Sequence, residues 1–267
     1  MILAVDIGNS NIVLSAFNNG QWGHTFRYET KGIKQEVYYE IALRQILMEW
    51  KIVTQDIRIG VISSVVPDLN EVVQEAIFSV LGCPTLIIGP SVYQNLDMNI
   101  PHPYEIGADL VANAYSALAQ YGDQLIIADF GTALSFVVVD KKRGIIGVTI
   151  APGLKTAAQS LSDQTAQLPV VPLEYPASAM GKDTVSAIQA GIMIGYLGLF
   201  KEIVNAIKDE VGYNFKVILT GGHSTVVEKL HNEVDNIDKM LTLEGMRLIG
   251  EYTYKYHPSL FSNRPKV

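Results

Sequence analysis

The chain has 267 residues, 48% of them apolar, with a formal net charge of −7 and a sequence pI of about 5.2. A chain of this size and composition can bury one sizeable core or two compact lobes. Because it is acidic and has no basic block, we expect neither nucleic acid nor an anionic membrane as its main partner. The single cysteine, Cys83, excludes an internal disulfide and a cysteine-rich metal site, and we expect it in the core.

Two further features concern targeting. The N-terminus runs directly into a predicted strand and lacks a basic region, so no signal peptide is expected. The longest uncharged run, residues 184–200, has 17 residues and includes Ser186 and Gln189. A spanning helix needs about 20 apolar residues, so we expect a cytoplasmic protein without a membrane segment.

The first element is residues 2–17, an apolar strand that ends in Asp6, a turn over residues 8–11 and a second apolar strand. The Asp6 carboxylate can hold a metal ion, Gly8 lets the backbone approach a phosphate, and Ser10 adds a hydroxyl donor. This combination is typical of a phosphate-binding turn. Taken alone, it is equally compatible with an ordinary β-hairpin.

The rest of the first half predicts a mixed α/β layer. Apolar spacing predicts strands over residues 22–29, 58–63 and 85–88, and helices over 35–50 and 67–81. Residues 89–106 hold three prolines, lack periodicity and are expected to form a loop. A helix is predicted from Ala108 to Tyr121, which puts Asp109 in its first turn. There, Asp109 could serve catalysis or only stabilise the helix dipole.

The second half repeats the opening pattern. Strands are predicted over residues 125–129, 134–139, 145–150 and 217–222, and helices over 155–167, 184–208 and 242–256, with a loop over 168–180. The first of these strands ends in Asp129, and Gly131 and Thr132 follow, just as Gly8 and Ser10 follow Asp6. The two aspartates are 123 positions apart. The repeat therefore predicts a duplicated fold that closes on a nucleotide.

The helix over residues 184–208 carries Gly191, Gly195 and Gly198 at a spacing that exposes one small face. Such a face allows another backbone to approach closely. We consider two interpretations, a subunit interface in a homodimer and a buried helix packed against the sheet.

The segments DIGNSN, DFGTA and LTGG resemble the phosphate-1, phosphate-2 and adenosine segments of the actin-like ATPase superfamily, which includes acetate and sugar kinases. The segments GADLVANA, TIAPG and GKDTVSAIQAG narrow the resemblance to one family. Together, the six segments resemble type III pantothenate kinase. The resemblance implies a duplicated ribonuclease H-like (actin-like ATPase) α/β fold with two lobes, residues 1–115 and 116–267, around a nucleotide cleft.

The resemblance also implies the function, the ATP-dependent phosphorylation of pantothenate to 4'-phosphopantothenate, the first step of coenzyme A biosynthesis. It implies Mg²⁺ and a monovalent cation, potassium or ammonium, near Asp129. Phosphoryl transfer also needs a base for the attacking alcohol, and Asp109 is the best candidate on its chemistry. The same aspartate matches the G-x-D motif of the family, which the resemblance identifies as catalytic.

The candidate site residues form three groups. Those assigned to ATP are Asp6, Ile7, Gly8, Asn9, Ser10, Asn11, Ile12, Val13 and Thr132. Those assigned to the acceptor are Ile100, Gly107, Ala108, Asp109, Leu110 and Thr184. Those assigned to a metal are Asp6 and Asp129. No zinc site is visible among the five histidines, and His223 beside the glycine pair is expected in a solvent-facing loop.

The sequence departs from the family on the acceptor side. Leu110 stands where the family carries an arginine, and Ile100 aligns with its substrate tyrosine. Together these changes remove up to six hydrogen-bond donors. Two alternatives to a pantothenate kinase therefore stay open, a kinase for a different small alcohol and a non-catalytic relative. The latter would bind nucleotide and act through protein contacts, like the family's Bvg accessory factors.

Overall fold

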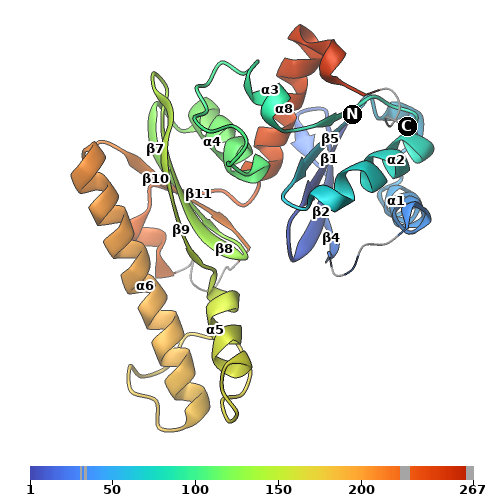
Figure 1. Ribbon diagram of the computed structural model, residues 1–267. Helices are drawn as coiled ribbons and strands as arrows, with labels where there is room; N and C mark the ends of the chain where they lie inside the picture. Colours follow the sequence, from blue (N-terminus) through green and yellow to red (C-terminus); the bar gives the residue numbers. More distant parts are fainter. Residues whose placement is uncertain (31, 33–34, 223–228, 263–267) are drawn as a thin grey trace. The chain divides into compact units, whose positions relative to one another are not determined.

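The computed structural model describes residues 1–30, 32, 35–222 and 229–262. The chain divides into two compact units. Unit 1 comprises Met1–Ser116 and Leu241–Val267, and unit 2 comprises Ala117–Met240. Each unit is built on one mixed β-sheet with helices packed against it (Figure 1).

Unit 1 contains a six-stranded sheet in the order β3-β2-β1-β5-β6, with β4 also paired to β2. Its strands are β1 (Ile2–Ile7), β2 (Asn11–Asn18), β3 (Gln21–Trp22), β4 (Phe26–Glu29), β5 (Ile59–Ser64) and β6 (Thr85–Ile87). The β1–β2 hairpin is antiparallel, whereas β5 lies parallel to β1 and β6 parallel to β5. The parallel pairs bury both faces of β1 and β5, which accounts for their nearly continuous apolar sequences.

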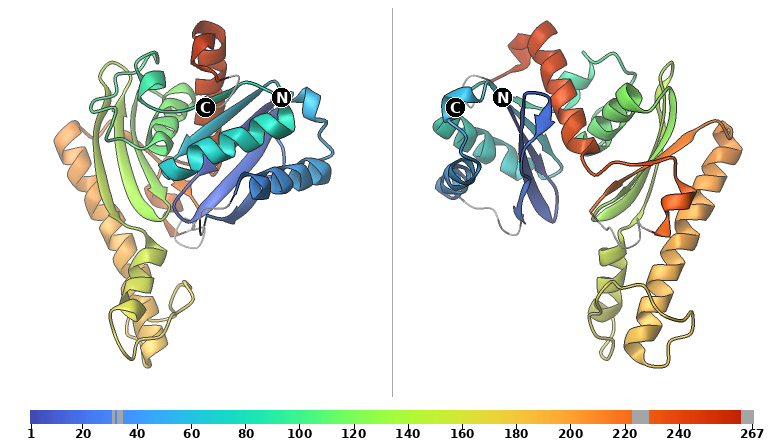
Figure 2. Two further views of the ribbon diagram at one scale, coloured as in Figure 1. Left: turned by 45° about the vertical axis from the view of Figure 1, so that its right-hand side comes forward. Right: turned by 180° about the vertical axis from the view of Figure 1, so that it is seen from behind.

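The helices of unit 1 cover both faces of this sheet, with α1 and α2 on one face and α8 on the other (Figure 2). They are α1 (Glu36–Trp50), α2 (Asn70–Leu81), α3 (Pro90–Tyr93), α4 (Ala108–Gln120, whose last turn belongs to unit 2) and α8 (Leu241–Tyr256). Helices α1 and α2 share one core with β1 and β2, because their buried residues recur at helical spacing and meet the alternate residues of the strands. The short 3₁₀ turns of the chain are Thr54–Asp56, Pro67–Leu69, His231–Glu233 and Pro258–Leu260.

The C-terminal helix α8 packs on β1 and β5 of unit 1. Two glycines allow the close approach, because a Cβ on Gly250 would lie 2.5 Å from Val61 and one on Gly245 would collide with the backbone of Ala112. This differs from the predicted lobes, which place residues 241–267 with the second half. The difference arises because these two glycines, 5 positions apart, let α8 fit closely against Ala112 and Val61. The hydrophobic periodicity of the sequence does not reveal such a fit.

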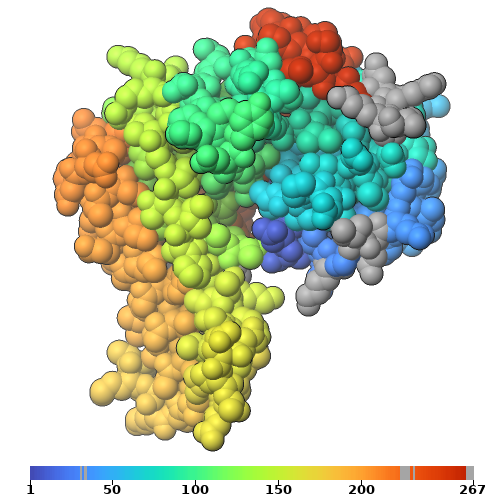
Figure 3. Space-filling model, viewed as in Figure 1, coloured from blue at the N-terminus to red at the C-terminus, as the bar shows by residue number. Residues whose placement is uncertain are grey.

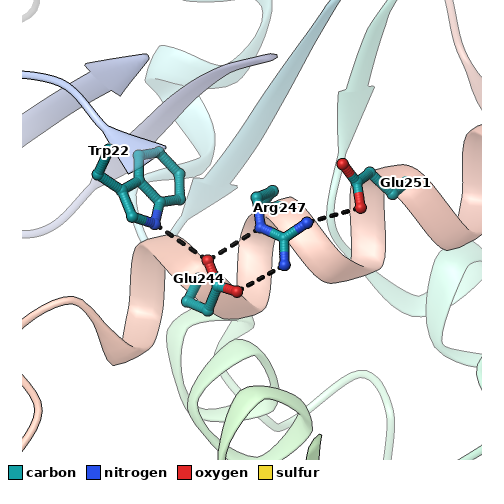
Figure 4. A network of polar contacts seen from close by, with 4 residues as sticks. All are labelled: Trp22, Glu244, Arg247 and Glu251. Atoms are coloured by element: carbon teal, nitrogen blue, oxygen red, sulfur yellow. Dashed lines mark hydrogen bonds and ion pairs between the residues drawn. The ribbon is translucent and has the colours of Figure 1, made fainter. Parts of the chain in front are cut away.

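A polar network also ties α8 to the β2–β3 corner (Figure 4). Trp22 donates its indole N–H to Glu244 at 3.0 Å, and Arg247 donates to both oxygens of the same carboxylate and to Glu251. The Arg247 guanidinium also lies over the ring of Phe17, 4.5 Å from its centre. Because Arg247 and Glu244 are largely shielded from solvent, this bidentate pair holds α8 more firmly than an exposed ion pair would.

Unit 2 contains a five-stranded sheet in the order β11-β10-β7-β8-β9. Its strands are β7 (Gln124–Phe130), β8 (Ala133–Asp140), β9 (Gly144–Pro152), β10 (Lys216–Gly221) and β11 (Asn236–Ile237). The β7–β8 and β8–β9 pairs are antiparallel, whereas β10 lies parallel to β7 and β11 parallel to β10.

The two sheets share a central arrangement. The first strand of each unit (β1, β7) lies between an antiparallel hairpin partner (β2, β8) and a parallel strand (β5, β10), and a further parallel strand (β6, β11) follows at that edge. The chain therefore has a duplicated ribonuclease H-like α/β fold, the architecture that the repeated Asp-x-Gly pattern predicts.

The helices of unit 2 are α5 (Leu154–Asp163) and α6 (Thr184–Val211). The C-terminal half of α6 crosses the sheet, where Phe200 packs against the rings of Phe130 and Phe136 at 6.0 and 5.8 Å. Its N-terminal half runs beyond the sheet together with α5, and the two form an arm that projects from unit 2 (Figures 1 and 3). Helix α6 is about 42 Å long at 1.5 Å per residue, longer than the sheet can cover.

Gly191, Gly195 and Gly198 are exposed on α6, and a Cβ at any of them would meet nothing within 4 Å. Helix α6 does pack against the sheet, through buried residues such as Met193, Phe200 and Val204, but the three glycines lie on its exposed side. The subunit-interface interpretation of the glycine face stays a prediction. Among the described residues, α6 alone is long and apolar enough to span a membrane. That is weak evidence, because core helices of soluble proteins meet the same criterion.

Most predicted elements lie within a few residues of the observed ones, and the exceptions have local causes. The strand predicted over residues 22–29 is two strands, because Gly23 donates to Ala16 and turns the chain before β4 begins. The predicted loop over residues 89–106 contains α3, whose Tyr93 and Val92 are buried. Helix α5 ends at Asp163, and β11 is too short to show a pattern. Cys83 is buried, as expected.

The glycine contacts of α8 predict a stability effect. Gly245→Ala forces a methyl group into the backbone of Ala112, so it should lower the free energy of unfolding by about 1–3 kcal/mol. Gly89→Ala is the control, because Gly89 has extended backbone (φ −177°) and open space around it; it should change stability by less than about 0.5 kcal/mol. Urea unfolding monitored by circular dichroism measures both. Equal effects of the two substitutions would contradict the close packing.

Candidate active site

The turn between β1 and β2 is held by hydrogen bonds on two sides. Gly8 donates its N–H to the carbonyl of Asn11 at 2.9 Å, which closes the turn. Thr30, directly after β4, donates its N–H to the Ser10 carbonyl at 3.0 Å and its hydroxyl to the Gly8 carbonyl at 2.7 Å. A Cβ on Gly8 would lie only 3.1 Å from the Asn11 oxygen, so the glycine keeps the turn tight.

The predicted ATP residues around this turn differ in exposure. Asn9 and Ser10 are exposed, whereas the side chains of Ile7 and Ile12 are completely buried in the core. Any contact of Ile7 or Ile12 with a ligand would therefore use backbone atoms. Val13 is partly exposed on β2 and pairs with Asp6.

Asp109 lies in the first turn of α4, and its carboxylate folds back over the start of the helix. Its Oδ1 accepts the N–H of Leu110 at 2.9 Å. A Cβ on Gly107 would lie 2.5 Å from the same oxygen, so a side chain at position 107 would displace the carboxylate. This explains in physical terms why a glycine must precede the aspartate by two positions.

Burial raises the pKa of Asp109 above its ordinary value, and this effect outweighs the hydrogen bonds from Leu110 N–H and from its own N–H, which lower the pKa. A desolvated carboxylate at a helix N-terminus is not merely a charge that complements the dipole, since such a charge is normally exposed. Its environment instead makes it a stronger proton acceptor.

Val65 connects Asp109 to the end of β1. The N–H of Val65 donates to the Ile7 carbonyl at 3.0 Å, and the Val65 side chain faces Gly107, 3.5 Å from where a Cβ would lie. Unit 1 thus brings the N-terminus of α4 beside the strand end that carries Asp6. These two candidate residues are 103 positions apart in the sequence.

Tyr93 is a further residue beside Asp109 that sequence reasoning missed. It is buried on α3, and after burial the negative charge of Asp109 is the second cause that raises its pKa. The phenol therefore stays protonated at neutral pH. The segment around it has no periodicity, so the prolines that indicate a loop concealed its place beside the carboxylate.

Asp6 and Asp129 occupy equivalent positions in the two sheets. Each is the penultimate residue of the first strand of its unit, and each pairs with a buried hydroxyl residue on the adjacent parallel strand, Ser63 for Asp6 and Thr220 for Asp129. The hydroxyl of Ser63 has no hydrogen-bond partner in the described part of the chain.

The surroundings of Asp6 suit a magnesium ion that arrives with a nucleotide. Mg²⁺ usually keeps several waters and is bound by one or two carboxylates plus phosphate oxygens. No cluster of three or more potential metal-ligating side chains exists among the described residues, so a cage made only of protein ligands is absent there. One carboxylate with the unpartnered Ser63 hydroxyl beside it on the neighbouring strand fits such a nucleotide-borne ion.

Two glycines lie close to the Asp129 carboxylate. A Cβ on Gly221 would lie 2.7 Å from Asp129 Oδ1, and one on Gly131 would lie 3.7 Å from it. Gly221 also adopts a φ of +103°, which only glycine adopts readily. The Asp129 carboxylate therefore lies close to the backbone of β10, an approach that a side chain at position 221 would prevent.

The turn after Asp129 is braced from β9 and α5. The carbonyl of Thr132 accepts from Gly153 N–H at 3.0 Å and from the Thr156 hydroxyl at 2.7 Å, while the Thr132 side chain is exposed. Gly153 is required here because a Cβ would collide with the carbonyls of Gly131 and Thr132.

Thr184 is exposed at the first turn of α6, in the arm of unit 2. Asp183 caps this helix through a capping box with Ser186. An apolar groove of about 450 Å³ lies beside Thr184 between α5 and α6. It is lined by Leu161, Leu168, Thr184, Ala187, Ile188, Gly191 and Ile192.

The structure thus divides the candidate residues between the units. Unit 1 holds Asp6, the 8–13 segment and Gly107–Leu110, and in it Ile100 and Leu110 are both partly exposed. Unit 2 holds Asp129, Thr132 and Thr184. His223 lies outside the described residues.

Comparison with known families gives one match. A sequence model of the type III pantothenate kinase family matches residues 2–206, which is most of the chain.

Among solved structures, a conserved putative Baf family transcriptional activator from Campylobacter jejuni superposes with a TM-score of 0.54 at 20% identity, covering 95% of this chain and 99% of that one. A putative 2-dehydro-3-deoxygalactonokinase from Sinorhizobium meliloti gives 0.59 at 13% identity, with 96% and 97% covered. The activator of 2-hydroxyisocaproyl-CoA dehydratase from Clostridium difficile, with bound ADPNP, gives 0.53 at 11% identity, with 95% and 96% covered. At these identities the similarity establishes the fold alone.

The raised pKa of Asp109 predicts a stability gain on neutralisation. An ionised carboxyl with a raised folded-state pKa destabilises the fold above that pKa, and the penalty disappears as the pH falls below the unfolded-state value of about 3.9. Asp109→Asn should therefore raise the thermal unfolding midpoint at pH 7, and the gain should shrink on acidification.

The control is Asp183→Asn, at another helix N-terminus, where hydrogen bonds from Ser186 lower the pKa of an exposed carboxyl. This group stabilises the fold above its unfolded-state pKa and loses that contribution on acidification, so its replacement should not raise the midpoint at pH 7. A lower midpoint for Asp109→Asn at pH 7 would mean that the helix dipole dominates at Asp109.

Proposed function

We propose that the chain, which belongs to the type III pantothenate kinase family, transfers the γ-phosphate of ATP to pantothenate and forms 4'-phosphopantothenate, the first step of coenzyme A biosynthesis. The observation that carries the proposal is the placement of Asp109. Its desolvated carboxylate is held at the start of α4. Val65 contacts both this helix start and the end of β1, which bears Asp6 and leads into the phosphate-binding turn.

Asp109 would accept the proton of the attacking hydroxyl as the new P–O bond forms. A general base is more effective when its pKa lies closer to the working pH, and burial moves the pKa of Asp109 in that direction. The hydrogen bonds from Leu110 N–H and the absence of a side chain at Gly107 fix the carboxylate at the helix end, so little reorganisation is needed on reaction.

Asp6, the turn over residues 8–11 and Thr132 would position the phosphates. When bound, Mg²⁺ neutralises phosphate charge, and a monovalent cation such as potassium or ammonium adds positive charge near Asp129. Asp6 would hold the first ion, and the Asp129 carboxylate, which lies beside Gly131 and Gly221, would hold the second.

The acceptor side supports the proposal less directly. Gly107, Ala108, Leu110, Ile100 and Thr184 are the candidate contacts, and two of these replace polar family residues. A non-catalytic relative that binds nucleotide is therefore the second candidate, and the fold similarity to a protein named as a putative Baf family transcriptional activator is compatible with it. A kinase for a different small alcohol is the third.

Cytoplasmic localisation and a homodimer complete the proposal. The small face of α6, formed by Gly191, Gly195 and Gly198, lies on the side of this apolar helix that its own unit leaves exposed. A second copy of the chain could bring its own helix close to this face, because three glycines remove the side chains that would separate the backbones.

Turnover with purified protein tests the function. Formation of ADP and 4'-phosphopantothenate from ATP, measured with and without pantothenate and in potassium or sodium, should depend on pantothenate and be faster in potassium. Because Leu110 cannot donate the charge-assisted hydrogen bonds of an arginine, affinity for pantothenate should be about ten- to a hundredfold below that of an arginine-bearing relative.

Leu110→Arg should then lower the KM for pantothenate with little change in kcat. Asp109→Asn removes the proposed general base but keeps the size of the side chain. It should reduce kcat by about 10²–10⁴-fold while ATP still binds. If the unmodified protein binds ATP but gives no pantothenate-dependent turnover at millimolar substrate, and Leu110→Arg restores none, the binding-module alternative replaces the kinase.

The homodimer has its own test. Gly195→Leu fills the small face of α6 and should shift the protein from dimer to monomer in light scattering, whereas Gln45→Leu, an exposed helical position on α1, should leave the dimer intact. If light scattering shows that the unmodified protein is a monomer, the proposed subunit interface on α6 does not exist.

A further inference from the structure

Thr30 stands outside every group of candidate site residues, yet it makes two hydrogen bonds to the phosphate-binding turn. Its N–H and its hydroxyl donate to the carbonyls of Ser10 and Gly8, at 3.0 and 2.7 Å. Thr30 itself is 8% exposed. The short hydroxyl bond, from a buried donor, links residues 22 positions apart in the sequence.

These bonds determine how the turn presents its amides. A peptide group is planar, and no cis peptide is present among the described residues, so each N–H points opposite to the carbonyl of the same group. The Gly8 carbonyl shares its peptide group with the N–H of Asn9, and the Ser10 carbonyl shares its group with the N–H of Asn11. Both carbonyls point to Thr30, so both amides point away from it.

We propose that Thr30 is a positioning residue that orients the Asn9 and Asn11 amides toward the phosphates of ATP. This inference rests on the proposed function, because it takes the turn over residues 8–11 as a phosphate site. Two amides that point the same way form a concave anion site, and a hydroxyl that holds the carbonyls on the other side prevents either oxygen from turning toward the phosphate. Thr30 would act without touching the nucleotide.

Isosteric substitution separates this role from packing. Thr30→Val keeps the shape and the backbone N–H bond but removes the hydroxyl, so the Gly8 carbonyl loses one donor and its peptide group can rotate. The affinity for ATP with magnesium chloride should fall about tenfold, the usual effect of one hydrogen bond. The affinity for adenosine, which has no phosphate, should stay unchanged, and Thr30→Ser should restore ATP binding to within about twofold.

Thr253→Val is the matched control. Thr253 is a completely buried threonine of α8 in unit 1, and its hydroxyl has no hydrogen-bond partner in the described part of the chain. The same substitution there should leave the affinities for ATP and adenosine unchanged. Calorimetric titration gives the affinities, and thermal unfolding shows whether each variant is folded.

The unmodified protein provides a second measurement should Thr30→Val not fold. In amide NMR spectra, the resonances of Asn9 and Asn11 should shift on titration with ATP and magnesium chloride but not with adenosine. The proposal is overturned if these resonances stay in place or if Thr30→Val binds ATP as tightly as the unmodified chain does. It is also overturned if Thr30→Val lowers the affinities for ATP and adenosine equally. Failure of the unmodified chain to bind ATP at all would instead sink the proposed function, and this inference with it.

Discussion

The structure depends on one constraint that both units share. The first strand of each unit is buried on both faces and lies between an antiparallel and a parallel neighbour. A carboxylate must nevertheless be placed near the C-terminal end of this strand. The four residues that precede each aspartate, Ile2–Val5 and Leu125–Ala128, are buried and apolar, and an ionised carboxylate cannot be buried among them without a partner. The penultimate position of the strand is therefore where the charge can still reach solvent or a cation.

The same constraint explains the glycines and hydroxyls around each carboxylate. In unit 1, Gly8 keeps the turn tight and Thr30 holds its carbonyls. In unit 2, Gly153 and Thr156 hold the Thr132 carbonyl, and Gly221 lets the backbone of β10 pass close to Asp129. The two halves thus hold the turn after their aspartate with different residues, as expected of a duplicated fold whose copies have diverged.

Sequence reasoning predicts those features that local pattern encodes. The repeated Asp-x-Gly turns and the long periodic helices predict the two sheets, α1, α2, α4 and α6, because each depends on a spacing of 2 or 3.6 residues. The candidate acid and base groups are visible for the same reason, since a carboxylate after a buried strand stands out against apolar neighbours.

Features that depend on contacts between distant segments could not be predicted. The return of α8 to unit 1 depends on the shape of Gly245 and Gly250 against Ala112 and Val61, and Tyr93 reaches Asp109 through a segment without periodicity. Thr30 shows no signal at all, because a threonine after a strand is common. The exposed face of α6 is ambiguous in sequence, since three glycines suit a core and an interface equally well.

The proposed function requires that Asp6 and Asp129 act on one nucleotide. A double-mutant cycle tests it directly, with the affinity for ATP and magnesium chloride measured calorimetrically for Asp6→Asn, Asp129→Asn and the double variant. Each single change should weaken binding, and the double variant should deviate from additivity, because the two carboxylates would share one phosphate chain and its ions. Strict additivity, or a single variant that binds like the unmodified protein, would contradict the claim.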